Sequence, residues 1–199
     1  MTTTGRAIAN PLQALLAQAA TTPRDTGESA RAKQRSRPHG AQVILCDVSS
    51  SMADPAGGGK ARIDHLRDAL HQVAEPGHIL IAFSSSVTMM QTVEELPEPS
   101  GGTSLELGLA AAARHSPRAT LVISDGEPTV PEAALRAAAR LPGRIDVIFC
   151  GDDHRHDAVE FMRELARVGA GAVVVHRWGE QLERPIAGTM RLLLAGPGR

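Results

Sequence analysis

The stretch that decides the fold is AQVILCDVSSSM, residues 41–52, in which an apolar run is followed by Asp47 and then by three serines at 49–51. The run has no polar alternation, which predicts a strand covered on both faces, as in a parallel sheet. Runs of the same kind follow at 78–83, 119–124, 145–150 and 171–176. A shorter run at 87–93 follows a serine-rich turn and predicts an antiparallel edge strand.

Helical patterns separate these strands. Apolar residues recur at the spacing of one helix face in four places: Ile63, Leu66, Leu70 and Val73; Leu105, Leu109 and Ala112; Ala134, Leu135 and Ala138; Met162, Leu165, Ala166 and Gly169. A last helix is expected over 181–194, with Pro185 near its start. This alternation predicts an α/β fold: a doubly wound, mostly parallel six-stranded sheet with helices on both faces.

The first 39 residues differ from the rest. Leu12, Leu15, Leu16 and Ala19 form the stripe of a short amphipathic helix, and a polar stretch rich in Arg and Lys follows it. We therefore expect a helix and flexible linker over 1–39 and one α/β domain over 40–199. The short helix either stays with its own domain or docks on another protein.

Composition excludes several classes of function. The chain has 199 residues, a net charge of -1 and only 2% aromatic residues, so a nucleic-acid-binding surface is not expected. Apolar runs fall short of the roughly 18 residues of a membrane helix, and the N-terminus is a poor signal peptide. We therefore expect a cytoplasmic protein without a membrane partner. Cys46 and Cys150 each end an apolar run, which favours buried thiols over a disulfide or zinc site.

Oxygen-bearing side chains lie at two strand ends and at one helix start, at the edge where doubly wound sheets bind ligands. They lie in three loops: DVSSS at 47–51, GGTS at 101–104 and DGEP at 125–128. Carboxylates and hydroxyls suit a hard cation such as Mg²⁺ or Mn²⁺, with water at the remaining positions. The alternative is that Asp47 and Asp125 only cap the helices that follow them.

These three motifs resemble the metal-ion-dependent adhesion site (MIDAS) of von Willebrand factor A (VWA) domains, intracellular prokaryotic type. DVSSSM matches the DxSxS motif, GGTSL the threonine loop and SDGEP the second acidic loop, and the resemblance spans 41–194. It implies a Rossmann-like VWA fold and a metal site made of Asp47, Ser49, Ser51, Thr103 and Asp125. The two serines would ligate the metal directly, Thr103 directly or through water, and the aspartates mostly through water. Mg²⁺ is the expected ion, with Mn²⁺ or Ca²⁺ as alternatives.

The resemblance also implies a function without catalysis. An ion held by neutral hydroxyls keeps an electrophilic open position, which suits an Asp or Glu of a protein partner. Intracellular members often act as adaptors or regulators of separate AAA+ ATPases of the MoxR or chelatase type, or in stress and conflict systems. In some members the last helix slides when the partner binds, and the run at 190–194 is the candidate here.

Two other functions remain open. One is a metal-dependent phosphoesterase, although His65, His71 and His78 lie on or beside the first helix of the domain rather than in a metal loop. The other is a structural subunit that docks through its N-terminal helix. A serine hydrolase is poorly supported, because no GxSxG motif surrounds the serines.

Three further segments have competing interpretations. The stretch DPAGGGKA at 54–61 fails the phosphate-loop pattern at both ends and is expected to form a rim beside the metal site. The loop after the fifth strand run is a candidate for a second metal site, a helix cap or a partner contact, through Asp152, Asp153, His154, His156 and Asp157. Arg177 and Trp178 form either an interface anchor or a partly buried plug.

Overall fold

A computed structural model describes residues 40–56, 58–152, 154–176 and 183–195. The expected N-terminal helix, the linker and the pair Arg177–Trp178 lie outside the described residues. The division of the chain at residue 39 therefore stays a prediction.

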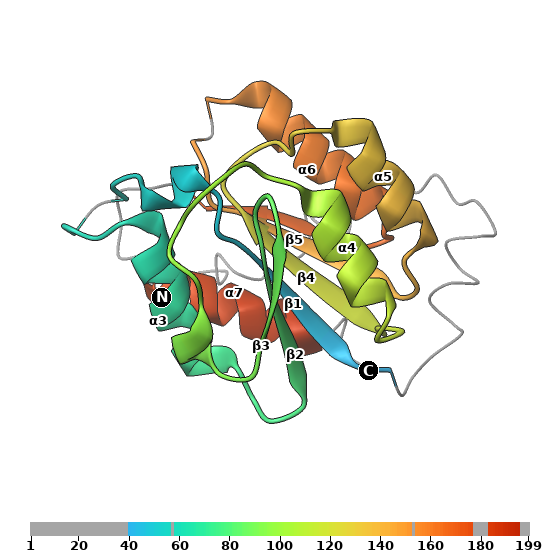
Figure 1. Ribbon diagram of the computed structural model, residues 1–199, viewed down its shortest axis with the longest axis horizontal. Helices are drawn as coiled ribbons and strands as arrows, with labels where there is room; N and C mark the ends of the chain where they lie inside the picture. Colours follow the sequence, from blue (N-terminus) through green and yellow to red (C-terminus); the bar gives the residue numbers. More distant parts are fainter. Residues whose placement is uncertain (1–39, 57, 153, 177–182, 196–199) are drawn as a thin grey trace, which may run out of the picture.

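The sheet has the expected mixed architecture (Figure 1). Its order is β3-β2-β1-β4-β5-β6; β3 pairs antiparallel to β2, and all other neighbours are parallel. The strands are β1 (Gln42–Asp47), β2 (His78–Phe83), β3 (Val87–Met90), β4 (Ala119–Ser124), β5 (Arg144–Phe149) and β6 (Val173–Val175). The chain order reverses between β1 and β4, which is where such sheets form a binding crevice.

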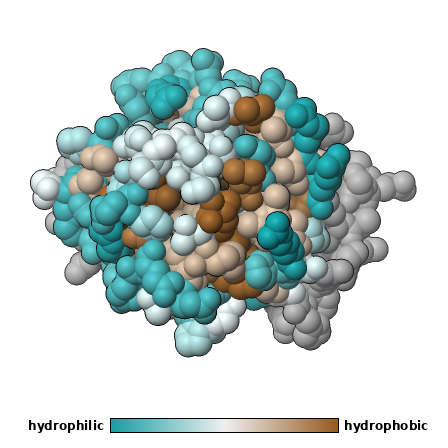
Figure 2. Space-filling view, in the orientation of Figure 1, coloured by the Kyte–Doolittle hydropathy of each residue, from teal (hydrophilic) through white to brown (hydrophobic). Residues whose placement is uncertain are grey.

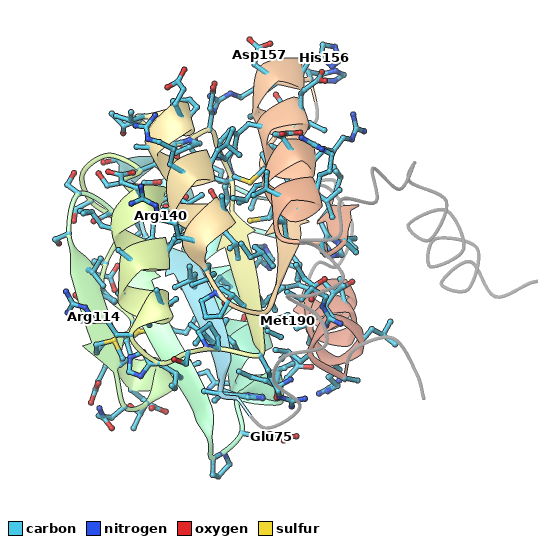
Figure 3. All side chains as sticks on the ribbon, turned by 90° about the vertical axis from the view of Figure 1, so that its right-hand side faces the viewer. Glu75, Arg114, Arg140, His156, Asp157 and Met190 are labelled. Atoms are coloured by element: carbon cyan, nitrogen blue, oxygen red, sulfur yellow. The ribbon has the colours of Figure 1, made fainter. Side chains whose placement is uncertain are left out.

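Helices cover both faces of the sheet (Figure 1). They are α3 (Arg62–Val73), α4 (Leu105–Ala113), α5 (Pro131–Arg140), α6 (His156–Val168) and α7 (Glu183–Ala195), with short 3-10 turns η1 (Ser50–Ala53) and η2 (Val93–Glu95). Buried residues of α3 and α7 pack on one face, and those of α4, α5 and α6 on the other. Figure 3 shows α7, which carries Met190, set apart from α5 and α6. The predicted fold class is confirmed.

The strand pattern places side chains alternately in the two cores. On β1, Val43 and Leu45 face α4 to α6, whereas Ile44 and Cys46 face α3 and α7. All four are fully buried, as the unbroken apolar run predicts. Gly108 lets α4 pack closely on β2, because a Cβ there would lie 3.2 Å from the Phe83 side chain.

Two edge strands are shorter than the sequence predicts. After Met90, the Gln91 N–H donates to a Glu95 carboxylate oxygen at 2.7 Å, so a side chain takes the place of a strand partner. Before β6, the Gly171 N–H donates to the Ala166 carbonyl of α6 at 2.9 Å. Local contacts therefore satisfy backbone groups that the apolar runs assigned to the sheet.

Both cysteines are free and buried, as expected. Burial raises the pKa of the Cys46 thiol to about 12 and that of Cys150 well above its usual value, so both remain protonated. None of the described helices is long and apolar enough to cross a membrane.

The surface beside β3, one of the two edge strands of the sheet, is partly apolar. Figure 2 shows hydrophobic residues gathered near the middle of this face, where β3 and α4 lie in Figure 1. Met89 of β3 and Leu107 of α4 are each 42% exposed. Scattered exposure of this size is common on protein surfaces and does not by itself define a binding site.

Candidate metal centre

Backbone hydrogen bonds join two of the three motif loops at the carboxyl edge of the sheet. The Ser50 N–H donates to the Gly101 carbonyl at 3.0 Å, and the Ser100 N–H donates to the Val48 carbonyl at 2.8 Å. Gly101 has a φ of +75°, and a Cβ there would lie 2.7 Å from Ser85 Oγ. The loop at 101–104 therefore needs glycine at this position, because of its positive φ and its close approach to Ser85 in the turn between β2 and β3.

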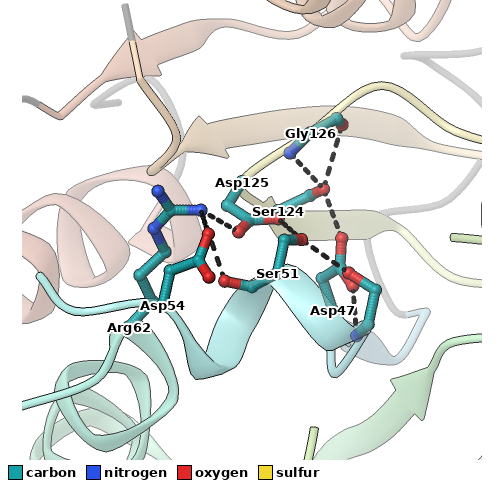
Figure 4. A network of polar contacts seen from close by, with 8 residues as sticks. Asp47, Ser51, Asp54, Arg62, Ser124, Asp125 and Gly126 are labelled. Carbon is teal, nitrogen blue, oxygen red and sulfur yellow. Dashed lines mark hydrogen bonds and ion pairs between the residues drawn. The ribbon is translucent and has the colours of Figure 1, made fainter. Parts of the chain in front are cut away.

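Asp47 ends β1 and is completely buried beneath the loops (Figure 4). One carboxylate oxygen accepts the Ser49 N–H at 2.8 Å, and the other accepts the Ser124 hydroxyl at 2.6 Å. Burial raises the pKa of Asp47 to about 6, even though these hydrogen bonds favour the ionised form. A buried carboxylate with a raised pKa is a group that a nearby cation would stabilise in its charged form.

The serine hydroxyls meet above this carboxylate. Ser49 Oγ and Ser51 Oγ are 3.2 Å apart, and Ser51 Oγ donates to Asp125 Oδ1 at 2.8 Å. Two neighbouring ligands of an octahedral Mg²⁺, each at about 2.1 Å, are separated by about 3 Å. The spacing and the all-oxygen chemistry of this pair therefore fit Mg²⁺ or Mn²⁺.

Asp125 follows β4, and its side chain is 0% exposed. Arg62, the first residue of α3, places Nη1 2.5 Å from Asp125 Oδ2. The same nitrogen lies 3.3 Å from the Ser51 carbonyl oxygen and 3.4 Å from an Asp54 carboxylate oxygen. The centre thus contains one basic side chain within its network of carboxylates and hydroxyls (Figure 4).

Thr103 lies in the neighbouring loop and is half-buried. Its backbone pairs with Thr129: the Thr103 N–H donates to Thr129 Oγ1 at 3.3 Å, and the Thr129 N–H donates to the Thr103 carbonyl at 2.9 Å. Among the described residues, the hydrogen bonds that join Asp47, Ser49, Ser51 and Asp125 do not include the Thr103 hydroxyl. Four of the five expected residues therefore form one network, and the fifth lies in the adjoining loop.

The capping alternative does not describe this arrangement. The residue that precedes η1 is Ser49, and the residue that precedes α5 is Val130. Asp47 instead accepts the Ser49 N–H and the Ser124 hydroxyl, and Asp125 accepts the Ser51 hydroxyl and Arg62.

Arg62 and Ser124 belong to the centre although sequence reasoning did not select them. Ser124 is the last residue of an apolar strand run, and Arg62 only begins an amphipathic helix. Ser124 could have been selected from the sequence, because it is a polar residue at the end of a strand and an acidic loop follows it. The signal for Arg62 is absent from local sequence, because its place depends on how the loop at 54–61 turns back.

That loop forms a tight turn beside the centre. The Ala56 N–H donates to the Lys60 carbonyl at 2.9 Å, Pro55 and Ala61 form an isolated β-bridge, and the Arg62 N–H donates to the Asp54 carbonyl at 3.1 Å. Gly58 has a φ of +62°, which favours glycine. The expected glycine-rich rim is thus a turn that returns the chain to the start of α3; Gly57 lies outside the described residues.

The loop from β5 to α6 supports Asp125 from the other side. The Cys150 N–H donates to the Ser124 carbonyl at 2.9 Å. A Cβ at Gly151 would lie 2.0 Å from the Asp125 carbonyl oxygen, so only glycine permits this approach. Gly151 therefore contributes to the position of a site residue without touching the site.

Asp152 makes a local contact in the loop that follows Gly151. The His154 N–H donates to Asp152 Oδ1 at 2.9 Å, and α6 is preceded by Arg155, so the expected helix cap from Asp152 is wrong. Figure 3 shows His156 and Asp157 at the start of α6. Within the described ranges, no three His, Cys, Asp or Glu residues gather as a metal site, and Asp153 lies outside those ranges.

Comparison with known proteins supports the fold. The chain matches no protein-family model and no curated protein sequence. Among solved structures, it is similar to the conserved hypothetical protein BatB from Bacteroides thetaiotaomicron, with 17% identity and a TM-score of 0.58 over 79% of this chain and 100% of that one. It is also similar to the SpRpn10 VWA domain, with 15% identity and a TM-score of 0.59 over 75% of this chain and 94% of that one.

A third similar structure is an aerotolerance-related membrane protein from Bacteroides fragilis NCTC 9343 with multiple mutations to serines. It shares 15% identity and a TM-score of 0.51, over 78% of this chain and 100% of that one. At these identities the similarity establishes the fold. The described residues have a VWA-like fold, as the sequence resemblance predicts.

Proposed function

We propose that this VWA-like domain is a protein-interaction module in which a divalent ion binds an acidic residue of a partner. The observation that carries the proposal is the hydroxyl pair Ser49–Ser51, which lies 3.2 Å apart over two buried carboxylates. Ser49 and Ser51 would hold the ion, Asp47 and Asp125 would orient them and act through water, and Thr103 would complete the set. Mg²⁺ is the proposed ion, with Mn²⁺ or Ca²⁺ as alternatives.

The chemistry of this donor set favours partner binding. The Ser51 hydroxyl donates its hydrogen to Asp125, which leaves its lone pairs for a cation. Two neutral ligands cancel none of the charge of the ion, so a further carboxylate is attracted to an open position. An Asp or Glu of a partner protein supplies that carboxylate. A separate AAA+ ATPase is the partner class that we propose from the resemblance, in an adaptor or regulator role.

The first test is metal binding by three neighbouring serine variants. Isothermal titration with Mn²⁺ compares wild type, Ser51→Ala and the matched control Ser50→Ala, because the Ser50 hydroxyl is exposed and donates to the Gly101 carbonyl instead. We expect Ser51→Ala to lose at least about tenfold in affinity, and Ser50→Ala to remain within about twofold of wild type. Equal affinity of all three proteins would rule out this hydroxyl pair as the metal site.

The second test concerns the partner. Tagged protein is incubated with native lysate in Mg²⁺ or in EDTA, and bound proteins are identified by mass spectrometry. The proposal expects a partner that is retained in Mg²⁺, released by EDTA and lost with Ser51→Ala but not with Ser50→Ala. A partner held equally under all conditions, and lost on deletion of residues 1–39, would instead support docking through the N-terminal segment.

A further inference from the structure

Arg62 brings a permanent positive charge into the candidate metal centre. Its Nη1 lies 2.5 Å from Asp125 Oδ2 and within 3.4 Å of both the Ser51 carbonyl oxygen and an Asp54 carboxylate oxygen. The Arg62 side chain is 14% exposed and that of Asp125 is 0% exposed, so salt and water screen this ion pair only weakly. One of the two buried carboxylates of the centre is therefore already paired with a cation.

The position of this guanidinium is fixed by the fold. The Arg62 backbone N–H donates to the Asp54 carbonyl at 3.1 Å, and the next residue, Ile63, is buried against the sheet. The turn at 54–61, which precedes Arg62, and helix α3, which begins at Arg62, thus fix the backbone of this residue. The backbone held in this way places the Arg62 side chain beside the centre, where its guanidinium donates to Asp125.

Asp125 divides its two oxygens between different partners. Oδ1 accepts the Ser51 hydroxyl, and Oδ2 accepts Arg62. An ion at the hydroxyl pair therefore shares the charge of Asp125 with the guanidinium, and the two cations repel each other in a weakly screened environment. The positive charge that remains on the ion is available to a carboxylate from outside.

We propose that Arg62 is a positioning residue that weakens divalent-ion binding at this centre and stabilises Asp125 when no ion is bound. The inference rests on the proposed metal site. As a consequence, the ion and the acidic partner bind cooperatively. The ion alone binds weakly because Arg62 neutralises part of the negative charge of Asp125, and the partner carboxylate adds negative charge at the ion. Binding linkage makes this coupling reciprocal.

The test is a Mn²⁺ titration of the full chain by calorimetry. Arg62→Gln removes the charge at the centre, and Arg67→Gln removes one positive charge from the same helix at the surface, where Arg67 pairs with Asp64 and Glu98. We expect Arg62→Gln to bind Mn²⁺ about tenfold more tightly than wild type, and Arg67→Gln to remain within about twofold.

The outcomes separate this inference from the proposed function. Wild-type binding together with equal or weaker binding by Arg62→Gln would overturn the role of Arg62 and leave the metal site intact. Equal tightening by Arg62→Gln and Arg67→Gln would also overturn it, because net charge would then explain the effect. If neither wild type nor Arg62→Gln binds Mn²⁺, the metal site itself is wrong, and the inference falls with it.

Thermal unfolding gives a second readout. In EDTA, Arg62→Gln leaves the buried Asp125 carboxylate without its cation, so we expect a lower Tm than that of wild type. Saturating Mn²⁺ should raise the Tm of Arg62→Gln more than that of wild type. If this variant folds only with metal, it is purified in Mn²⁺ and then stripped. Unfolding on stripping is the expected result, whereas a variant unfolded even in Mn²⁺ would overturn the proposal.

Discussion

Asp47→Asn should stabilise the metal-free protein although it removes a residue of the metal centre. Asp47 is 0% exposed, and burial raises its pKa from 3.8 to about 6. Keeping it ionised at pH 7 therefore costs up to about 3 kcal/mol, at about 1.4 kcal/mol per pKa unit. Asparagine has the same shape without the charge, so this cost disappears.

The surrounding hydrogen bonds can accept the amide. Its oxygen can receive the Ser49 N–H, which now donates to the carboxylate at 2.8 Å. Its NH₂ group would face Ser124 Oγ, which can accept a hydrogen bond while turning its own hydrogen to the Gly126 carbonyl, 3.2 Å away. Because no buried polar group loses its partner, we expect a net gain of about 1–3 kcal/mol at pH 7.

The assay is urea unfolding in EDTA between pH 4 and 8, with Glu160→Gln on the exposed face of α6 as the control. A raised folded-state pKa gives stability that is present below the unfolded value of 3.8 and is lost as pH rises through about 6. The advantage of Asp47→Asn over wild type should therefore grow from pH 4 to pH 7, and Glu160→Gln should show no such trend. A variant that is no more stable than wild type at pH 7 would refute this reasoning.

Three further substitutions test other parts of the structure. Gly151→Ala places a Cβ where the Asp125 carbonyl oxygen lies 2.0 Å away, so it should lower both Tm and Mn²⁺ affinity, measured by thermal unfolding and calorimetry. Gly188→Ala in α7 meets no atom within 4 Å and should raise the free energy of unfolding by about 0.5–1 kcal/mol in urea. Burial lowers the pKa of His176, whose Nε2 lies 3.1 Å from Thr189 Oγ1, so protonation opposes folding. Stability from His176 should therefore be present above about pH 6.5 and lost as pH falls, and His176→Gln should flatten this dependence in urea unfolding at pH 5 and pH 7.

The sequence was sufficient to predict the fold because its strands are buried on both faces. A central strand such as β1 or β4 can be recognised from an unbroken apolar run, since both of its faces pack against helices. The first and last residues of the edge strands were harder to predict. Glu95 ends β3 by capturing a backbone N–H, and such a contact between a side chain and the backbone leaves no periodic signal.

The candidate site was only partly predictable for a similar reason. Two of the three motifs follow strands, and parallel strands bring their carboxyl ends to one edge, so chain order was enough to gather Asp47, Ser51 and Asp125. Arg62 comes from the start of a helix, and its place depends on a turn whose geometry no motif describes. Ser124 was treated as part of a strand, although its hydroxyl joins Asp47 to the backbone of the next loop.

The contacts of α7 bear on the helix movement that the VWA resemblance implies. Gln42 Nε2 donates to the Leu194 carbonyl at 2.5 Å, and Arg144 Nη2 donates to the Leu193 carbonyl. These carbonyls belong to the last turn of the helix, where no intrahelical partner is available. A slide of α7 along the sheet would break both bonds, so partner binding would have to offset their loss.

The hydrogen bonds of the serines favour ligand binding over hydrolysis. A nucleophilic serine needs a base that can take its proton. Ser51 instead donates to Asp125 Oδ1, and the other oxygen of this carboxylate accepts a hydrogen bond from Arg62, so both oxygens already have partners. Ser124 donates to Asp47, which lies beneath the hydroxyl pair rather than at the surface. A hydroxyl that donates its hydrogen to a carboxylate, as Ser51 does, keeps its oxygen lone pairs for a cation, which is what the proposed metal site requires.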